Sequence, residues 1–383
     1  MKSNLTDIQT KAVHAGEIAP VLGAVTLPVF QSATYLYGGE KSYHDVHYIR
    51  LNNTPNHEVL GRKLAALENA EAAMVASSGM AAISTALLTV LSAGDHLLAI
   101  DALYGGTHDF VVGDLPSFGV EVTLVDPAKP ETWAAQLKPR TRAFYVETIT
   151  NPLVRVPALK EAVAFARERG LVSMIDNTFA SPVNFRPAEW GFDLSLHSCT
   201  KYLNGHSDIV AGAFIGKAEL VGRVTKRLNH LGGSLDPHAC FLLHRGIKTL
   251  ALRVRHQNES ALRIAQFLAG HAAVESVHYP GLPTHPDRAR AAELLDGFSG
   301  MLAFELKGGA EAAERFLSRL TIPYVAPSLG GVESLITRPV TTSHAGLTPE
   351  ARAKAGITDG LIRFSTGIEA TEELIEDFER AMG

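Results

Sequence analysis

Short apolar runs alternate with amphipathic stretches through the middle of the chain. The apolar runs predict strands at residues 72–77, 96–100, 120–125, 142–147, 172–176, 194–199 and 209–215. Helical spacing of apolar residues between several of these runs predicts helices at residues 58–69, 80–91 and 158–169. Short apolar strands that alternate with helices are typical of a mainly parallel sheet covered on both faces. The pattern therefore predicts an α/β domain in this part of the chain.

The pattern changes at both ends of this region. Beyond about Arg245, a smaller α+β domain is predicted by helices at 248–269, 310–320 and 371–382 and by strands at 301–306 and 361–365. The first fifty residues mix Gly, Pro, Tyr and His with little periodicity, which predicts an extended arm that contacts a neighbouring subunit. We therefore divide the chain into an N-terminal arm (1–55), a large α/β domain (56–245) and a small C-terminal α+β domain (246–383).

Composition narrows the class of protein. The chain has 383 residues, 46% of them apolar and 20% charged, as in soluble globular proteins. A net charge of −5 without a dense Lys/Arg run argues against nucleic-acid binding. Two cysteines cannot form a disulfide framework, the polar N-terminus lacks the apolar region of a secretory signal, and no apolar run is long enough to span a bilayer. We therefore expect a cytoplasmic protein with no membrane or nucleic-acid partner.

One lysine follows an apolar run and two hydroxyl residues. The run at 194–199 leads to Lys201, and Ser198 and Thr200 stand just before it on one face of the predicted strand. A partly desolvated lysine amine can lose its proton and attack a carbonyl, while hydroxyl groups beside it can hold an anion. An aldehyde that carries a phosphate meets both conditions, and pyridoxal phosphate (PLP) is such a molecule. This segment alone fits an ordinary strand that ends in a surface lysine equally well.

Two other strand ends carry residues suited to the same molecule. Ser78, Gly79 and Met80 lie where a strand meets a helix, and a helix N-terminus binds phosphate through its free N–H groups. Asp176 ends a strand about one βαβ unit before Lys201, where it could pair with a protonated pyridine nitrogen. A serine-capped turn and a capping aspartate are the structural alternatives.

Two further residues suit a flat cofactor and its substrate. Tyr104, among glycines after a strand, could lay its ring over a flat cofactor. Arg363 alternates with apolar neighbours in a strand and could grip a substrate carboxylate bidentately. A turn tyrosine and a salt-bridged strand arginine are the alternatives. The sixteen histidines show no metal-binding motif, and no hydrolase elbow or Walker A sequence occurs, so we expect no catalytic metal.

Taken together, these segments resemble the Cys/Met metabolism (trans-sulfuration) family of PLP-dependent enzymes over essentially the whole chain. The motifs that carry the resemblance are SSGMAA at 77–82, LYGGT at 103–107, ETITNP at 147–152, DNTFA at 176–180, HSCTKY at 197–202, RGIKTL at 245–250, SLGGVESL at 328–335 and RFSTG at 363–367. The resemblance implies the fold of the PLP-dependent transferases (aspartate aminotransferase, fold type I), with a large PLP-binding domain and a smaller C-terminal domain.

The resemblance also assigns roles to residues. It implies that Lys201 forms the imine with the cofactor and moves protons during the reaction, assisted by Tyr104, which stacks on the ring. The cofactor is further held, by the same resemblance, through Ser78, Gly79, Met80, Asn151, Asp176, Ser198 and Thr200. The substrate contacts implied are Arg363, Ser328, Asn151 and Tyr48.

A Tyr-x-Arg pair of this family reaches the cofactor phosphate of the neighbouring subunit. Tyr48 and Arg50 match that pair. The resemblance therefore implies a homodimer at minimum, and a homotetramer as the common assembly, with active sites shared between subunits.

The reaction implied is γ-elimination or γ-replacement on cystathionine or an O-acyl-homoserine, as in cystathionine γ-synthases and γ-lyases. A cystathionine β-lyase or a methionine γ-lyase comes next, followed by an aminotransferase or an inactive relative that serves as a binding protein. Residues 51–55 depart from the usual Tyr-Gly-Asn-Pro-Thr, and Pro327 stands where many relatives carry Glu or Tyr. Methionine γ-lyases usually carry Cys where this chain has Gly106, which favours the cystathionine enzymes.

Overall fold

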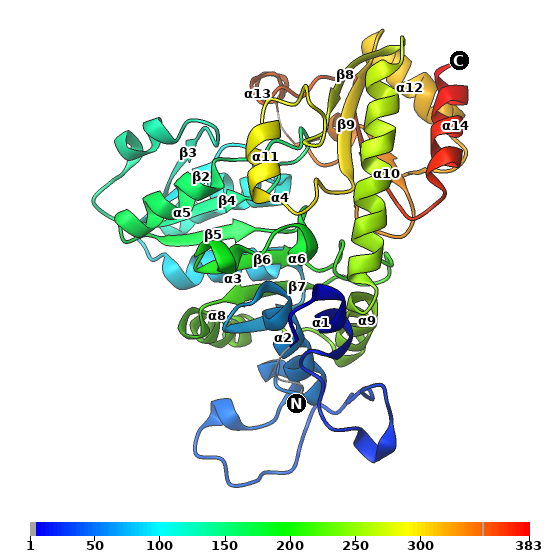
Figure 1. The fold of residues 1–383 in the computed structure, drawn as a ribbon. Coiled ribbons are helices and arrows are strands. Elements are labelled where there is room, and N and C mark those ends of the chain that lie inside the picture. Colours follow the sequence, from blue (N-terminus) through cyan, green and yellow to red (C-terminus); the bar gives the residue numbers. More distant parts are fainter. Residues whose placement is uncertain (1–4, 347) are drawn as a thin grey trace.

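The computed structural model describes residues 5–346 and 348–383, which contain two β-sheets (Figure 1). The larger sheet has the strand order β1-β7-β6-β5-β4-β2-β3. Its strands are β1 (Ala72–Ala76), β2 (His96–Ile100), β3 (Glu121–Val125), β4 (Thr141–Glu147), β5 (Val172–Asp176), β6 (Leu194–Ser198) and β7 (Gly212–Gly216). Only β7 pairs antiparallel with its neighbours, so the sheet is mainly parallel, as the alternating pattern predicts.

Helices cover both faces of this sheet. They include α2 (Pro55–Glu68), α3 (Gly79–Val90), α4 (Gly105–Asp109), α5 (Leu159–Glu168), α6 (Ser181–Asn184), α7 (Pro187–Trp190), α8 (Ala218–Leu231) and α9 (Pro237–Ile247). Neighbouring residues of β6 point to opposite faces: His197 Nε2 lies 2.6 Å from Glu68 Oε1 of α2, whereas Ser198 packs against Gly79 of α3. Helices α2 and α3 therefore lie on opposite sides of the sheet.

The second sheet is smaller and lies in the C-terminal part of the chain. Its order is β10-β11-β12-β9-β8, built from β8 (Val274–His278), β9 (Met301–Leu306), β10 (Tyr324–Val325), β11 (Leu335–Thr337) and β12 (Leu361–Ser365). The helices of this part are α10 (Leu250–Gly270), α11 (Arg288–Leu294), α12 (Gly309–Arg319), α13 (Pro349–Lys354) and α14 (Thr371–Met382). A cluster of four phenylalanines, Phe304, Phe316, Phe364 and Phe378, fills the space between β9, β12, α12 and α14. The predicted α/β fold with a second, smaller sheet-bearing part is confirmed.

The predicted arm is not extended throughout. Residues 8–14 form helix α1 (Ile8–His14), which Asp7 caps by accepting a hydrogen bond from the Gln9 N–H at 2.8 Å, and Ala12 is buried in the main core. The prediction of an extended chain was wrong here because a helix of seven residues is too short to show a clear apolar periodicity. Beyond α1, the blue loops of residues 17–50 extend away from the body (Figure 1). The three domain boundaries themselves stay a prediction.

Helices α8 and α9 and strand β8 also lie where the sequence analysis predicts no element. The edge strand β8 is only half-buried, so it lacks the continuous apolar run that marks β2 or β5. None of the described helices is both long enough and apolar enough to cross a bilayer.

Candidate active site

Lys201 lies between the two sheets, just after β6. Its Nζ donates a hydrogen bond to Ser328 Oγ at 2.7 Å, although the two residues are 127 positions apart in the chain. Burial, together with the positive charge of Arg363, lowers the pKa of the Lys201 amine to about 8. A substantial share of this amine is therefore neutral near pH 7–8, the form that attacks carbonyls and accepts protons.

Arg363 lies opposite Lys201 on β12, the central strand of the smaller sheet. Its Nη1 donates to Asn151 Oδ1 at 3.0 Å and its Nη2 donates to the Ser328 carbonyl at 3.2 Å. Burial lowers the pKa of this guanidinium to about 10, so it stays charged at neutral pH. It forms no salt bridge with any carboxylate of the described residues. A buried cation with only neutral partners is suited to bind the carboxylate of a ligand.

Ser328 connects these two cations. Its hydroxyl accepts from Lys201 while its carbonyl accepts from Arg363, and its φ of 85° lies in the left-handed region that serine rarely adopts. Sequence periodicity contains no signal for such a residue, because it lies in the loop between β10 and β11.

The N-terminus of α3 faces Ser198. Ser78 caps the helix by accepting from the Ala81 N–H at 3.0 Å, which leaves the first N–H groups of the helix, at Gly79 and Met80, available to an anion. A Cβ on Gly79 would lie 2.8 Å from Ser198 Cβ, so only glycine permits this close approach. The structure thus brings the predicted phosphate-binding residues of two elements together.

Thr200 is placed differently from the expectation that it shares a strand face with Ser198. Strand β6 ends at Ser198, and the chain turns there, with the Lys201 N–H bonded to the Ser198 carbonyl at 3.2 Å. The Thr200 hydroxyl accepts from the Ala211 N–H at 3.1 Å. Alternation therefore does not extend from Ser198 to Thr200.

Asp176 ends β5 on the same face of the sheet as Ser198, because it pairs in register with Leu196. One carboxylate oxygen accepts the Thr178 N–H at 2.9 Å. Burial raises the pKa of Asp176, and Thr178 and His197 act in the opposite direction. A nearby cation, such as a protonated pyridine nitrogen, would stabilise this buried carboxylate.

Tyr104 follows β2 and is 44% exposed. Its N–H donates to Glu147 Oε1 at 2.6 Å, and its ring lies against Gly106, where a Cβ would come within 2.8 Å of Tyr104 Cε1. The glycine therefore leaves room for the ring.

Two titratable residues of this region received no role in the sequence analysis. Glu147 ends β4 in register with Asp176, and burial, with Asp176 nearby, raises the pKa of its carboxyl well above the usual range. The strand-end position that drew attention to Asp176 could have identified Glu147 as well. His344 is buried in a loop, and burial, with Arg363 nearby, lowers the pKa of its imidazole to about 4. Because it belongs to no regular element, its sequence carries no comparable signal.

Tyr48 and Arg50 are not brought to this site within one chain. Arg50 Nη1 donates to the Asn229 carbonyl at 2.8 Å and its Nη2 to Tyr43 Oη at 2.6 Å, while its guanidinium lies 5.5 Å from the centre of the Tyr48 ring. These contacts place the pair near the end of α8. No described interaction joins it to Lys201.

The residues present fit PLP. A partly neutral amine, a glycine-lined helix N-terminus, a buried carboxylate and an unneutralised buried arginine converge from β5, β6, α3 and β12. These groups match an aldehyde, a phosphate, a pyridinium and a substrate carboxylate, respectively.

Comparisons with known proteins agree with this arrangement. The model of the Cys/Met metabolism PLP-dependent enzyme family matches residues 9–383. An L-methionine γ-lyase of Fusobacterium nucleatum subsp. nucleatum is 39% identical, over 100% of this chain and 99% of its own. A cystathionine β-lyase of Bacillus subtilis is 40% identical, over 94% of this chain and 92% of its own. The crystal structure of cystathionine γ-synthase from Xanthomonas oryzae pv. oryzae superposes with a TM-score of 0.95 at 39% identity, covering 99% of this chain and 98% of that one.

Proposed function

The chain belongs to the Cys/Met metabolism family of PLP-dependent enzymes, and on that premise we propose that it catalyses γ-elimination or γ-replacement on cystathionine or an O-acyl-homoserine. The observation that carries the proposal is the Lys201 amine, held by Ser328 beside the unneutralised Arg363. A base that removes protons from more than one carbon of a substrate needs that substrate held in a fixed position. Lys201 supplies the base, and Arg363 supplies the group that holds the substrate carboxylate.

Pyridoxal phosphate, when bound, supplies an aldehyde for the substrate amine and a ring that withdraws electrons from the substrate. Lys201 removes the Cα proton of the substrate and, for γ-chemistry, a Cβ proton afterwards. Its lowered pKa suits it to exchange protons near neutral pH. Tyr104, whose backbone Glu147 fixes, assists departure of the γ-substituent as an acid or base.

The other assigned residues hold the cofactor and substrate in our proposal. The phosphate is bound by the N–H groups of Gly79 and Met80, at the helix end that Ser78 caps, and by the hydroxyls of Ser198 and Thr200. Asp176 pairs with the pyridine nitrogen, Tyr104 stacks on the ring and Asn151 lies near its phenolic oxygen. Arg363 and Ser328 bind the substrate carboxylate, with Asn151 and Tyr48 nearby.

The assembly is proposed to be a homodimer at minimum, and a homotetramer as the complete form. Tyr48 and Arg50 would then bind the cofactor phosphate of the neighbouring subunit, which agrees with their position away from Lys201 in their own chain. The arm exposes large apolar side chains that a partner could cover, namely Leu22, Val25, Leu36 and Tyr37. We also propose a cytoplasmic location, which suits the two free, buried thiols of Cys199 and Cys240.

A cystathionine β-lyase or a methionine γ-lyase is the second candidate, because relatives of both activities are as similar in sequence as the cystathionine γ-synthase. Gly106 disfavours the methionine γ-lyase, because enzymes of that activity usually carry a cysteine at this position. In this chain, a cysteine there would require the Tyr104 ring to move. An aminotransferase or an inactive binding protein is less favoured, because Lys201, Asp176 and Arg363 all converge in one site.

Product analysis tests the proposal. The enzyme is incubated with cystathionine, with methionine, with cysteine and with an O-acyl-homoserine plus cysteine, and products are identified by mass spectrometry. γ-Elimination of cystathionine gives cysteine, ammonia and 2-oxobutanoate, whereas β-elimination gives homocysteine, ammonia and pyruvate. Pyruvate and homocysteine as the only products would overturn the γ-assignment.

A variant pair tests the role of the lysine. Lys201→Ala is expected to abolish turnover, while Lys217→Ala, which changes an exposed lysine paired with Asp193, keeps the wild-type rate. A normal rate from Lys201→Ala would contradict the mechanism.

A further inference from the structure

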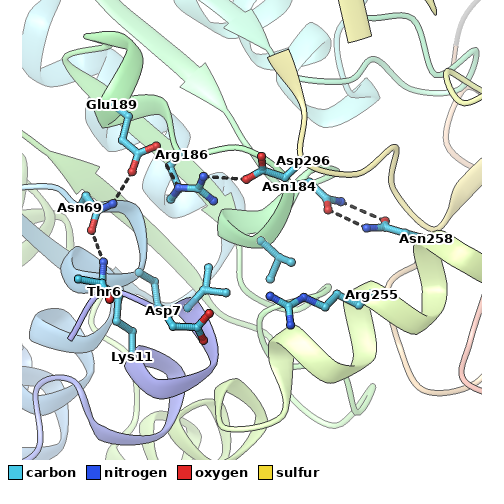
Figure 2. Close-up of a pocket in the computed structure, with 13 residues that line it drawn as sticks. Thr6, Asp7, Lys11, Asn69, Asn184, Arg186, Glu189, Arg255, Asn258 and Asp296 are labelled. Atoms are coloured by element: carbon cyan, nitrogen blue, oxygen red, sulfur yellow. Dashed lines mark hydrogen bonds and ion pairs between the residues drawn. The ribbon is translucent and has the colours of Figure 1, made fainter. Parts of the chain in front are cut away.

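A cavity of about 390 Å³ lies away from Lys201, between α1, the end of α2, the α6–α7 segment and α10 (Figure 2). Its size falls within the range of about 300–1,000 Å³ that is usual for small-molecule pockets. None of the residues to which we assign catalysis or cofactor binding lines it.

One wall of this cavity is fully ion-paired. Arg186 Nη2 lies 2.7 Å from Asp296 Oδ2, and its Nε lies 3.0 Å from Glu189 Oε2. Glu189 in turn accepts a hydrogen bond from Asn69. Arg186 therefore has its charge neutralised and has little to offer a ligand.

Two other cations of the lining, Lys11 and Arg255, have no ion pair among the described residues. Lys11 is buried, and among the described residues its ammonium donates to the uncharged amide oxygen of Asn69 alone. Burial lowers the pKa of this amine. Arg255 extends from α10 toward the cavity (Figure 2), and its guanidinium forms no hydrogen bond or ion pair with any described residue. The Lys11 ammonium is thus directed at Asn69, whereas Arg255 presents its guanidinium to the cavity without a carboxylate of the described residues at ion-pair distance, which favours an anionic group beside Arg255.

The acidic residues of the lining limit what the anion can be. Asp7, Glu189 and Asp296 balance the three cations, so a compact dianion would face as much repulsion as attraction. Asp7 uses one carboxylate oxygen to cap α1 and keeps the other for a second donor. Figure 2 shows the Asp7 and Arg255 side chains pointing toward one another, although no ion pair joins them. A molecule with both charges, carried close together, matches this arrangement.

We propose that the cavity binds a small zwitterion of the α-amino acid class, with its carboxylate on Arg255 and its ammonium on Asp7. The floor is uncharged, because Asn184 and Asn258 donate to one another at 3.1 and 2.7 Å. The amino-acid side chain lies against this floor.

An amino acid bound in this cavity would contact the segment that follows Asp176 of the active site. Asn184 and Arg186 belong to the segment that begins at Asp176, and the Asn177 side chain fixes its far end by donating to the Phe185 carbonyl at 2.8 Å. The same occupant would contact α10, which leads into the smaller sheet. A bound amino acid would therefore contact both the larger-sheet part and the smaller-sheet part of the chain, at a site separate from the substrate site.

Equilibrium dialysis of radiolabelled L-alanine tests the proposal. Holoenzyme is first reduced with borohydride, which fixes Lys201 to the cofactor and prevents alanine from forming an imine there. Arg255→Gln is expected to weaken binding at this cavity by at least about tenfold. Arg263→Gln is the matched control, because Arg263 lies on the same helix but pairs with Glu372 outside the cavity, and it should leave binding unchanged.

Two outcomes would overturn the assignment. If Arg255→Gln binds alanine as tightly as the control, any alanine site lies elsewhere, for example at Arg363. If sulfate displaces labelled alanine as effectively as unlabelled alanine does, the cavity recognises anions and not zwitterions. Because Arg255 is exposed on α10, its substitution is not expected to disturb folding, which thermal unfolding of the variant checks.

Discussion

Arg363 and Arg155 both join the larger sheet to later parts of the chain, but their electrostatic surroundings are opposite. Arg155 binds Asp287 through two hydrogen bonds of 2.5 and 3.1 Å, and this pairing raises the pKa of its guanidinium. Arg363 is more deeply buried, and its hydrogen-bond partners among the described residues, Asn151 and Ser328, are both neutral. Burial lowers the pKa of its guanidinium. The comparison teaches that a paired arginine fastens the structure, whereas a buried unpaired one is kept ready for a ligand.

The largest effect is expected at Arg363. Changing Arg363→Gln keeps hydrogen-bond donors but removes the charge that we assign to the substrate carboxylate. We expect kcat/KM to fall by roughly 100- to 1,000-fold, with no loss in the midpoint of thermal unfolding. A variant with near-normal kinetics would show that Arg363 is structural, as Arg155 is.

An intermediate effect is expected from giving Arg363 the kind of partner that Arg155 has. Asn151→Asp would place a carboxylate where the amide oxygen now accepts from Arg363 at 3.0 Å. The new ion pair competes with the substrate, so we expect KM to rise by about tenfold or more, while thermal stability stays equal or increases. An unchanged KM, with full cofactor occupancy in the absorption spectrum, would show that Arg363 does not need to be free of a carboxylate partner to bind the substrate.

At Arg155 we expect the effect to be on stability. Arg155→Gln leaves the buried Asp287 with Arg290 as its remaining cation. Because Arg155 is partly exposed, we expect the free energy of unfolding to fall by only about 1–3 kcal/mol, measured in urea, with kcat/KM within about twofold of wild type. Arg142→Gln is the control, since Asp95 keeps Arg140, and should cost less. If the fall in kcat/KM, expressed as a free energy, exceeded the fall in the free energy of unfolding, Arg155 would act on the reaction as Arg363 does.

The smallest effect is a shift in pH dependence. Only the neutral Lys201 amine captures the cofactor aldehyde, so the rate at which cofactor-free protein takes up PLP should rise as pH increases through about 8. The Arg363 charge favours the neutral amine. Removing it in Arg363→Gln should therefore raise the pKa of Lys201 and move the midpoint to higher pH. A midpoint that stays in place or moves down would show that Arg363 does not act on the amine.

The sequence was sufficient where structure follows from local pattern. Strands β2, β5, β9 and β12 have the predicted bounds because each is a buried apolar run. The strand-end positions of Asp176 and the lysine after β6 were predictable for the same reason.

What could not be predicted depends on contacts between distant residues. Ser328 reaches Lys201 from a loop without periodicity, and Lys11 meets Asn69 only after α1 folds onto α2. The choice between β- and γ-elimination also has no local signal, because both begin with removal of the same proton.

The serine at position 328 ties two functions of the site to one backbone conformation. Its hydroxyl accepts from the amine of the base, and its carbonyl accepts from the guanidinium that we assign to the substrate carboxylate. Both contacts depend on the same unfavourable φ, so a substitution that relaxes this backbone is expected to displace both groups together. An engineer who alters either contact at this serine therefore also alters the other.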